Sequence, residues 1–280
     1  MAEETRQKFS GREGSGGNPL FQNGVPSRFP SSPKVFFIGA GPGDPGLLTV
    51  KAAQVIAGAG LVLFAGSLVP PEVVAGAGET ARVLDSSGMT LEETHALLVA
   101  AVRGGQVAVR VHTGDPALYG AVAEQARLLT RDGVPWEIIP GVTSASAAAA
   151  ALGVSFTMPE ATQTLILTRL AGRTPVPEAE SLRALAAHQS SMAIYLSAGD
   201  PEGLARELLA AGLCPDTPVG VACRVGWPDE QTFFTTIASL PADVHAHDIT
   251  RQTLFLVLPH HDAEARSKLY DPDFTHGFRP

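Results

Sequence analysis

A glycine- and proline-rich turn between an apolar run and a helical pattern is the feature of this sequence that most constrains its fold. The apolar run at residues 34–38 ends in the motif Gly-Ala-Gly-Pro-Gly-Asp-Pro at residues 39–45. Glycine allows positive φ angles and lets a ligand approach the backbone, because it has no Cβ. In a strand–loop–helix unit, such a turn usually places a small molecule at the end of a parallel strand. The alternative is that the glycines serve the geometry of the turn alone.

The residues after this turn do not fit a nicotinamide-dinucleotide site. Such a site needs an acidic residue at the end of the second strand, roughly 20 positions further on, to bind the ribose hydroxyls. Here the second apolar run, 61–64, is followed by Ala65, Gly66 and Ser67. Pro42 also fixes φ within the loop and lacks the backbone N–H that a pyrophosphate would use. The sequence therefore predicts a ligand other than a dinucleotide.

Short apolar runs alternate with helical patterns over residues 34–152, which predicts a mostly parallel sheet covered on both faces. The predicted strands of this first part are 34–38, 61–64, 81–84, 106–111 and 136–139. Its predicted helices are 46–58, 70–76, 90–103, 118–131 and 143–152, the last with Thr143 and Ser144 as N-cap residues.

The second part of the chain has a different pattern and predicts a mixed sheet. Its strands are expected at 164–169, 192–197, 218–224, 232–237 and 253–258, with helices at 178–187, 201–211 and 239–246. No helix is predicted between 218–224 and 232–237, so these two strands are expected to form an antiparallel hairpin. At 280 residues the chain is long enough for two domains. The Gly- and Pro-containing stretch 153–160 marks the predicted boundary.

This division gives an N-terminal α/β domain over 34–153 and a C-terminal α/β domain over 154–260. Polar tails are predicted at 1–33 and 261–280, the first of them disordered. The sequence contains no run of about 18 apolar residues, which a membrane span requires, and residues 1–33 lack the apolar segment of a signal peptide. Cys214 and Cys223 fit a reduced compartment and are expected to be buried rather than disulfide-bonded. We therefore expect a cytoplasmic protein without a membrane partner.

The formal net charge of −8 argues against nucleic acid as a partner, because proteins that bind phosphate backbones usually carry a basic face. An anionic small substrate would need a locally basic site. Candidate cations at the ends of strand-like runs are Arg110, His112, Arg169, Arg173 and Arg224. The alternative for these residues is an ordinary solvated surface position.

Two further loops repeat the arrangement of the first. One carries the turn Gly114-Asp115-Pro116 after a strand, and the other is the segment 140–144 before an alanine-rich helix. Turn amides and helix N-termini at such places form polar cradles. Because carboxyl ends of parallel strands meet at one sheet edge, we expect the three loops to converge on one crevice. For Asp115, both a ligand contact and an Asx turn that caps its own helix remain open.

Metal and covalent mechanisms are poorly motivated by this sequence. The eight histidines are scattered, and no Cys/His spacing matches a zinc site. No Gly-x-Ser-x-Gly elbow is present. The pattern favours a group-transfer enzyme that binds two ligands and aligns them.

The three loops together resemble those of the tetrapyrrole methylases, two-domain methyltransferases that use S-adenosylmethionine. The resemblance covers roughly residues 34–259. Within the family, three stretches resemble the branch that methylates C11 of precorrin-4 in cobalamin synthesis: residues 112–120, residues 162–169 with 172–178, and residues 227–230. The resemblance implies two α/β domains with an interdomain cleft, a homodimer, a tetrapyrrole substrate and S-adenosyl-L-homocysteine as product. Alternatives on the same scaffold are methylation of a different ring carbon, of RNA or of a protein.

The resemblance also implies which residues form the site. The matching cofactor-binding positions are Pro42, Thr113, Gly114, Asp115, Leu118, Thr143, Ser144, Leu196, Val225 and Thr253. The carboxylates of the tetrapyrrole would suit Arg110, Arg169 and Arg173, because guanidinium groups bind carboxylates bidentately. Gly41 and Gly43 are placed on the substrate side as well. The implied methyl transfer needs no metal.

The sequence departs from some relatives at one position with a chemical role. These relatives carry an acidic residue after the second strand, proposed as a proton acceptor, where this chain has residues 65–67 with no carboxylate. A general base therefore does not carry over. Asp44, Asp85 and Glu230 are the weakly supported substitutes.

Overall fold

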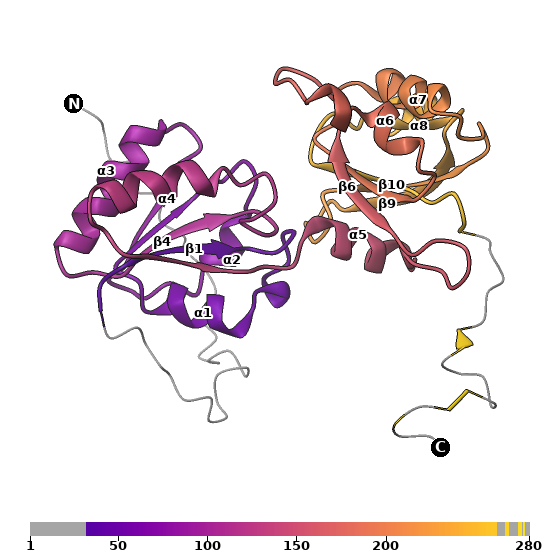
Figure 1. The fold of residues 1–280 in the computed structure, drawn as a ribbon. Coiled ribbons are helices and arrows are strands. Elements are labelled where there is room, and N and C mark those ends of the chain that lie inside the picture. The colour runs from indigo at the N-terminus through magenta and orange to yellow at the C-terminus, as the bar shows by residue number, and fades with distance from the viewer. Residues whose placement is uncertain (1–31, 262–266, 269–273, 276, 278–280) are drawn as a thin grey trace.

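Two five-stranded sheets organise the residues that the computed structural model describes, which are 32–261, 267–268, 274–275 and 277. Helices cover both sheets (Figure 1). The predicted α/β fold with one parallel and one mixed sheet is confirmed. The predicted tails fall almost entirely outside the described residues. No helix among the described residues is long and apolar enough to cross a membrane.

The first sheet is entirely parallel and has the order β3-β2-β4-β1-β5. Its strands are β1 (Val35–Gly39), β2 (Leu61–Phe64), β3 (Arg82–Asp85), β4 (Ala108–His112) and β5 (Trp136–Ile139). Helices α1 (Val50–Ala57) and α2 (Pro71–Val74) bury one face, and α3 (Leu91–Arg103) and α4 (Val122–Arg131) bury the other. Burial of both faces explains why β1 and β2 are uninterrupted apolar runs.

The second sheet is mixed and has the order β6-β7-β10-β8-β9. Its strands are β6 (Leu165–Arg169), β7 (Ser191–Tyr195), β8 (Pro218–Cys223), β9 (Gln231–Thr236) and β10 (Thr253–Val257). Only the pair β6–β7 is parallel, and β8 and β9 form the predicted antiparallel hairpin. One face packs against α6 (Leu182–Ala186), α7 (Pro201–Ala210) and α8 (Leu240–Ala246).

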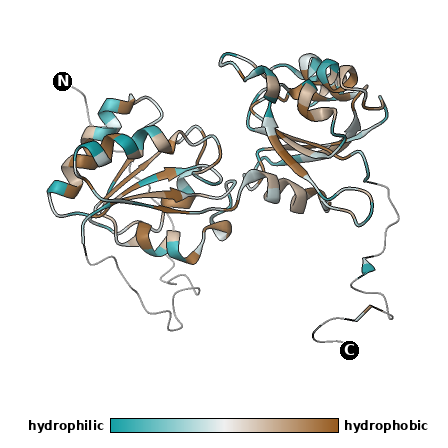
Figure 2. Ribbon diagram, in the orientation of Figure 1, coloured by the Kyte–Doolittle hydropathy of each residue, from teal (hydrophilic) through white to brown (hydrophobic). Residues whose placement is uncertain are grey.

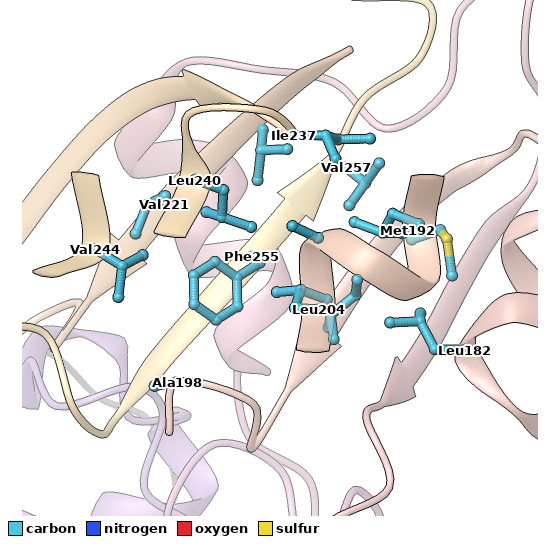
Figure 3. Close-up of a cluster of buried hydrophobic side chains, with 14 of the residues drawn as sticks. Leu182, Met192, Ala198, Leu204, Val221, Ile237, Leu240, Val244, Phe255 and Val257 are labelled. Atoms are coloured by element: carbon cyan, nitrogen blue, oxygen red, sulfur yellow. The ribbon is translucent and has the colours of Figure 1, made fainter. Parts of the chain in front are cut away.

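Apolar side chains from strands and helices form the core beneath these helices. Phe255 of β10 lies among Leu204 of α7, Leu240 of α8 and Val221 of β8 (Figure 3). Figure 2 shows the strands of both sheets mainly in hydrophobic colours, with hydrophilic residues on the outer helices. Burial of this apolar area is the largest favourable contribution to folding where the helices pack on each sheet.

Helix α5 (Ser144–Leu152) packs on the other face of the second sheet rather than on the first. Its alanines, among them Ala145 and Ala148, contact Leu254 and Leu256 of β10, and their small side chains let the helix approach the strand closely. The predicted N-terminal domain, 34–153, includes this helix. Because of its packing, we propose that the boundary between the domains lies before α5 and not after it.

Several predicted element bounds are wrong for local reasons. The helix expected at 46–58 begins only at Val50, because Pro45–Leu47 forms a 3₁₀ turn capped by Asp44. The helix expected at 118–131 begins at Val122, after Tyr119 and Ala121 adopt positive φ angles. The helix expected at 178–187 is divided into the 3₁₀ turn Glu178–Glu180 and α6. Of the two cysteines, both free, Cys223 is buried as expected but Cys214 is exposed.

The three loops predicted to converge do meet, through direct backbone contact. Gly41 and Gly114 exchange two hydrogen bonds, with N···O distances of 3.2 and 2.7 Å. A Cβ added to Gly39 would stand 2.5 Å from Gly141 Cα and 2.7 Å from the Gly114 carbonyl oxygen. Such a contact leaves no room for any side chain, so glycine is required where these backbones touch.

Gly141→Ala is expected to lower the free energy of unfolding by about 1–3 kcal/mol, the usual cost of overpacking. The added methyl group would collide with the carbonyl oxygen of Gly114. Urea denaturation of the full chain measures the effect. Gly88→Ala is the matched control, because a Cβ at Gly88 meets nothing within 4 Å. Equal stability of the two variants would contradict the requirement for glycine.

Candidate active site

A cavity of about 660 Å³ lies where the converging loops of the first sheet face the strand ends of the second. All ten residues that the resemblance implies for the cofactor line this cavity: Pro42, Thr113, Gly114, Asp115, Leu118, Thr143, Ser144, Leu196, Val225 and Thr253. Arg110, expected on the substrate side, lines it too. Residues more than 200 positions apart in the sequence thus share one concave surface.

Asp115 connects two of the three loops. Its Oδ1 atom accepts a hydrogen bond from the backbone N–H of Ala117 at 2.8 Å, and its Oδ2 atom accepts one from Gly141 at 2.9 Å. The first bond forms the Asx turn, one of the two roles expected for Asp115. Both oxygens therefore have structural partners, although the residue also lines the cavity.

Four hydrogen bonds join segments around the cavity that lie far apart in the sequence. The Tyr195 hydroxyl at the end of β7 lies 2.7 Å from Thr143 Oγ1 and accepts from the Ala145 backbone N–H. The indole of Trp227 donates to the carbonyl of Pro42 at 3.2 Å. The amide of Gln252 donates to the carbonyl of Ser67 at 3.1 Å.

The first of these bonds corrects a prediction about α5. Thr143 is the N-cap residue of this helix, as expected, but its side chain makes no cap hydrogen bond. Tyr195 of β7, in the sheet against which the helix packs, accepts from the first turn of the helix instead. Burial raises the pKa of Tyr195, so its hydroxyl stays protonated and can donate to Thr143.

Unusual backbone conformations gather around the cavity. Eight non-glycine residues of the described chain have positive φ angles, and five of them line the cavity: Tyr119, Ala121, Leu196, Arg224 and Gln252. Leu196 has a φ of 54°, and the residue, which carries an apolar side chain, is 71 % exposed. Such conformations cost free energy and are concentrated at functional sites in proteins. A ligand in the cavity would cover the exposed apolar surface of Leu196.

The three weak candidates for a general base do not line the cavity. Asp44 and Glu230 accept hydrogen bonds from the backbone N–H groups of Gly46 and Gly226 in their own turns. Partial burial acts to raise the pKa of Asp85, but backbone hydrogen bonds, led by the one from Gly66, outweigh it and lower the pKa. A carboxylate whose pKa is lowered is a poorer proton acceptor.

The structure also places four of the predicted substrate-binding residues outside the cavity lining: Gly41, Gly43, Arg169 and Arg173. The guanidinium of Arg169 donates to the carbonyls of Leu170, Thr174 and Pro175 and so holds together the loop after β6. Burial raises the pKa of Tyr119, which does line the cavity, and the positive charge of Arg169 acts in the opposite direction. Arg173 is exposed on the same loop.

Gly43 has a packing role that sequence reasoning missed. A Cβ at this position would stand 2.5 Å from Cδ1 of Trp227, so glycine allows the indole to reach the loop. The guanidinium of Arg224 in turn lies 4.0 Å from the ring centroid of Trp227. Trp227 was matched to the family pattern, but no spacing in the sequence shows that it would contact the first loop.

The chain is similar to known methyltransferases over most of its length. Residues 34–241 match the family model of the Tetrapyrrole (Corrin/Porphyrin) Methylases. The chain is 48 % identical over 251 residues to the cobalt-precorrin-4 C(11)-methyltransferase of Priestia megaterium, covering 88 % of this chain and 97 % of the relative. It is 44 % identical over 248 residues to the precorrin-4 C(11)-methyltransferase of Pseudomonas aeruginosa, covering 88 % and 98 %.

Solved structures point to the same family. A cobalt precorrin-4 methyltransferase superimposes with a TM-score of 0.80 at 46 % identity, covering 82 % of this chain and 96 % of that one. A uroporphyrin-III C-methyltransferase from Thermus thermophilus, complexed with S-adenosylhomocysteine, gives a TM-score of 0.65 at 28 % identity, covering 80 % and 96 %. The chain belongs to the tetrapyrrole methylase family, as the sequence analysis expects.

One histidine of the cavity gives a testable pH dependence. Burial lowers the pKa of His112 from 6.5 to about 3, and the positive charge of Arg110 acts in the same direction. The unfolded chain therefore takes up a proton near pH 6.5 that the folded chain does not, so stability is lost as the pH falls. For this one group the free energy of unfolding falls by at most about 1.4 kcal/mol per pH unit.

We expect His112→Asn to lose this contribution. Between pH 6.5 and pH 5, its free energy of unfolding should fall less steeply with pH than that of the unsubstituted protein, as measured by urea denaturation. The comparison cancels the histidines that both proteins share. Parallel pH profiles would show that the imidazole of His112 is not neutral at low pH in the folded protein.

Proposed function

We propose that this protein transfers the methyl group of S-adenosyl-L-methionine to C11 of precorrin-4, or of its cobalt complex, in the synthesis of the corrin ring of cobalamin. The observation that carries this proposal is the 48 % identity to a cobalt-precorrin-4 C(11)-methyltransferase over nearly the whole length of that relative. The cavity supports it independently, because all ten expected cofactor positions line one surface.

The cavity fits S-adenosylmethionine in size and in the character of its lining. Its volume of about 660 Å³ suits a ligand of this size together with part of a second one. Leu118, Leu196 and Val225 offer apolar contacts, and the hydroxyls of Thr113 and Ser144 offer polar ones. When bound, S-adenosylmethionine supplies a methyl group that is attached to a positively charged sulfur. S-adenosylhomocysteine, which keeps the sulfur, is the leaving group.

The residues of the chain contribute alignment and exclusion of water rather than a reactive group of their own. Methyl transfer requires the donor sulfur, the methyl carbon and the accepting carbon in line at contact distance. The hydrogen bonds of Tyr195, Trp227 and Gln252 keep the two walls at a defined separation. Leu196 presents apolar surface that excludes water from a bound ligand.

The substrate side of the site is also part of the proposal. We place Arg110 in the cavity and Arg169 and Arg173 on the rim as partners of the tetrapyrrole carboxylates, with Gly41 and Gly43 in the neighbouring loop. The location of Arg169 near Tyr119 supports this arrangement. The homodimer, the cytoplasmic location and the absence of a nucleic-acid partner stay predictions from the sequence.

Incubation of the purified protein with precorrin-4 or cobalt-precorrin-4 and methyl-labelled S-adenosylmethionine tests the activity. Mass spectrometry should show the gain of one methyl group, and NMR of the labelled product should place it on C11. Label on a different ring carbon would instead indicate another tetrapyrrole methylase activity. Absence of transfer to either substrate would overturn the proposal and favour an RNA or protein substrate.

Leu118→Arg is expected to weaken binding of S-adenosylhomocysteine by at least about a hundredfold, because a guanidinium in this apolar contact must be desolvated without a partner. Isothermal titration calorimetry measures the affinity, and binding by the unsubstituted protein should survive EDTA. Ala117→Arg is the matched control, because Ala117 is exposed and does not line the cavity. Unchanged affinity in Leu118→Arg, with the fold intact, would remove Leu118 from the site.

A further inference from the structure

Arg224 lies where the second sheet meets the loops of the first. It follows β8 directly and lines the cavity, and its side chain is 23 % exposed. Its Nε atom donates to the carboxylate of Asp229 at 2.6 Å, and its Nη1 atom donates to the side-chain oxygen of Gln252. The central carbon of the guanidinium lies 4.0 Å from the ring centroid of Trp227. Three residues of the second domain thus hold this one side chain.

Two of these three partners reach the first domain. The indole of Trp227 donates to the carbonyl of Pro42 in the first loop, and the amide of Gln252 donates to the carbonyl of Ser67 in the loop after β2. Both of the accepting residues line the cavity. Arg224 therefore lies directly behind two separate contacts with two different loops of the opposite wall.

Arg224 fixes the orientation of both partners. An arginine only donates and a carbonyl only accepts, so the amide of Gln252 can serve both neighbours only with its oxygen toward Arg224 and its nitrogen toward Ser67. The indole of Trp227 lies between the guanidinium and the space left by Gly43. A guanidinium over an indole face is attracted to it and so restricts the ring.

The backbone of the same residues is strained. Arg224 and Gln252 have φ angles of 50° and 51°, and the N–H of Arg224 donates to the carbonyl of Gln252 at 2.9 Å. Neither residue type favours such a φ angle. Conformations of this kind persist only where the surroundings enforce them, and they are concentrated at functional sites. The strain therefore falls on the two residues whose side chains together reach Ser67.

The charge of Arg224 is already compensated within the protein. Its hydrogen bond lowers the pKa of Asp229, so this carboxylate is ionised at neutral pH and the pair stays charged. The guanidinium thus has a counter-ion without any ligand. With its charge paired and its face on Trp227, the side chain is better suited to hold its neighbours than to bind an anionic ligand.

We propose that Arg224 is a positioning residue for methyl transfer, which acts by holding Trp227 and Gln252 in the orientations that fix the two loops. The inference rests on the proposed function and adds to it a residue that acts through its neighbours. Without Arg224 the loops still offer their contacts to a ligand, but they occupy a wider range of positions. Because the transfer requires three atoms in line, the rate should fall more than the affinity.

Arg224→Met tests this separation of rate from affinity, because it keeps a long apolar stem and loses the guanidinium. The kcat for the tetrapyrrole that the unsubstituted protein methylates should fall by roughly tenfold to a hundredfold at saturating S-adenosylmethionine. The Kd of S-adenosylhomocysteine, measured by calorimetry, should stay within about threefold. Arg183→Met is the matched control, because it removes an ion pair with Glu207 in the same domain but outside the cavity lining. Thermal unfolding shows that each variant is folded.

Two further substitutions remove the contacts through which Arg224 acts. Trp227→Phe keeps an aromatic ring beneath the guanidinium but cannot donate to Pro42. Gln252→Glu keeps an acceptor for Arg224 but cannot donate to Ser67. Each should lower kcat in the same direction as Arg224→Met.

Combined variants then show whether the effects share one path. In the protein that carries Trp227→Phe and Gln252→Glu, adding Arg224→Met should lower kcat by no more than about twofold further, because the contacts it supports are already lost. Tyr195→Phe changes the separate contact with the third loop. Its effect on kcat should therefore multiply with that of Arg224→Met.

The contrary outcomes are distinguishable from one another. Unchanged kcat in folded Arg224→Met would overturn the inference, and so would a full further loss when Arg224→Met is added to the two neighbouring substitutions. A loss of S-adenosylhomocysteine affinity as large as the loss of kcat would show that Arg224 contacts the cofactor itself. A raised KM for the tetrapyrrole with kcat unchanged would show direct binding of the substrate, and either result would overturn the positioning role. Absence of methyl transfer by the unsubstituted protein would reject the proposed function, whereas transfer that Arg224→Met leaves unimpaired rejects this inference alone.

Discussion

The contact of three backbone segments without side chains between them is the constraint on which the rest of this structure depends. Three glycines lie at the ends of neighbouring strands of the parallel sheet, and their backbones touch. Gly39 is the last residue of β1, and Gly114 and Gly141 follow β4 and β5. Asp115 adds a hydrogen bond from the second loop to the third. Because the loops cannot separate without losing these contacts, they present one continuous surface at the sheet edge. The cavity is built on that surface.

The second domain completes the cavity and contacts the loops of the first domain directly. The Tyr195 hydroxyl lies 2.7 Å from Oγ1 of Thr143 in the third loop, and Trp227 reaches the first loop through the space left by Gly43. Helix α5 lies against the second sheet, so the chain crosses between domains directly after the converging loops. A ligand held by residues of both walls therefore depends on the same hydrogen bonds that position the domains.

The sequence was sufficient to predict the fold class, the two sheets and the convergence of the loops, because these depend on local signals. Alternating apolar runs and helical patterns mark the elements, and glycine clusters mark the turns. The capping of α5 by Tyr195 and the packing of α5 on the second sheet depend on contacts between distant segments. No local pattern contains that information. The positive φ angles of Leu196 and Arg224 could likewise not be predicted from the sequence, since neither residue type favours them.

The chemistry that the cavity can support depends on which of its charged residues already have a partner within the protein. Asp115 is the one acidic residue among the described residues that line it, and both of its oxygens hold backbone N–H groups. Asp44, Asp85 and Glu230 are engaged in turns outside it. No carboxylate of the described cavity lining is thus available as a strong base, whereas Arg110 is a cation without a counter-ion. This imbalance favours a reaction in which an anionic substrate is bound and aligned, and in which alignment rather than proton transfer lowers the barrier.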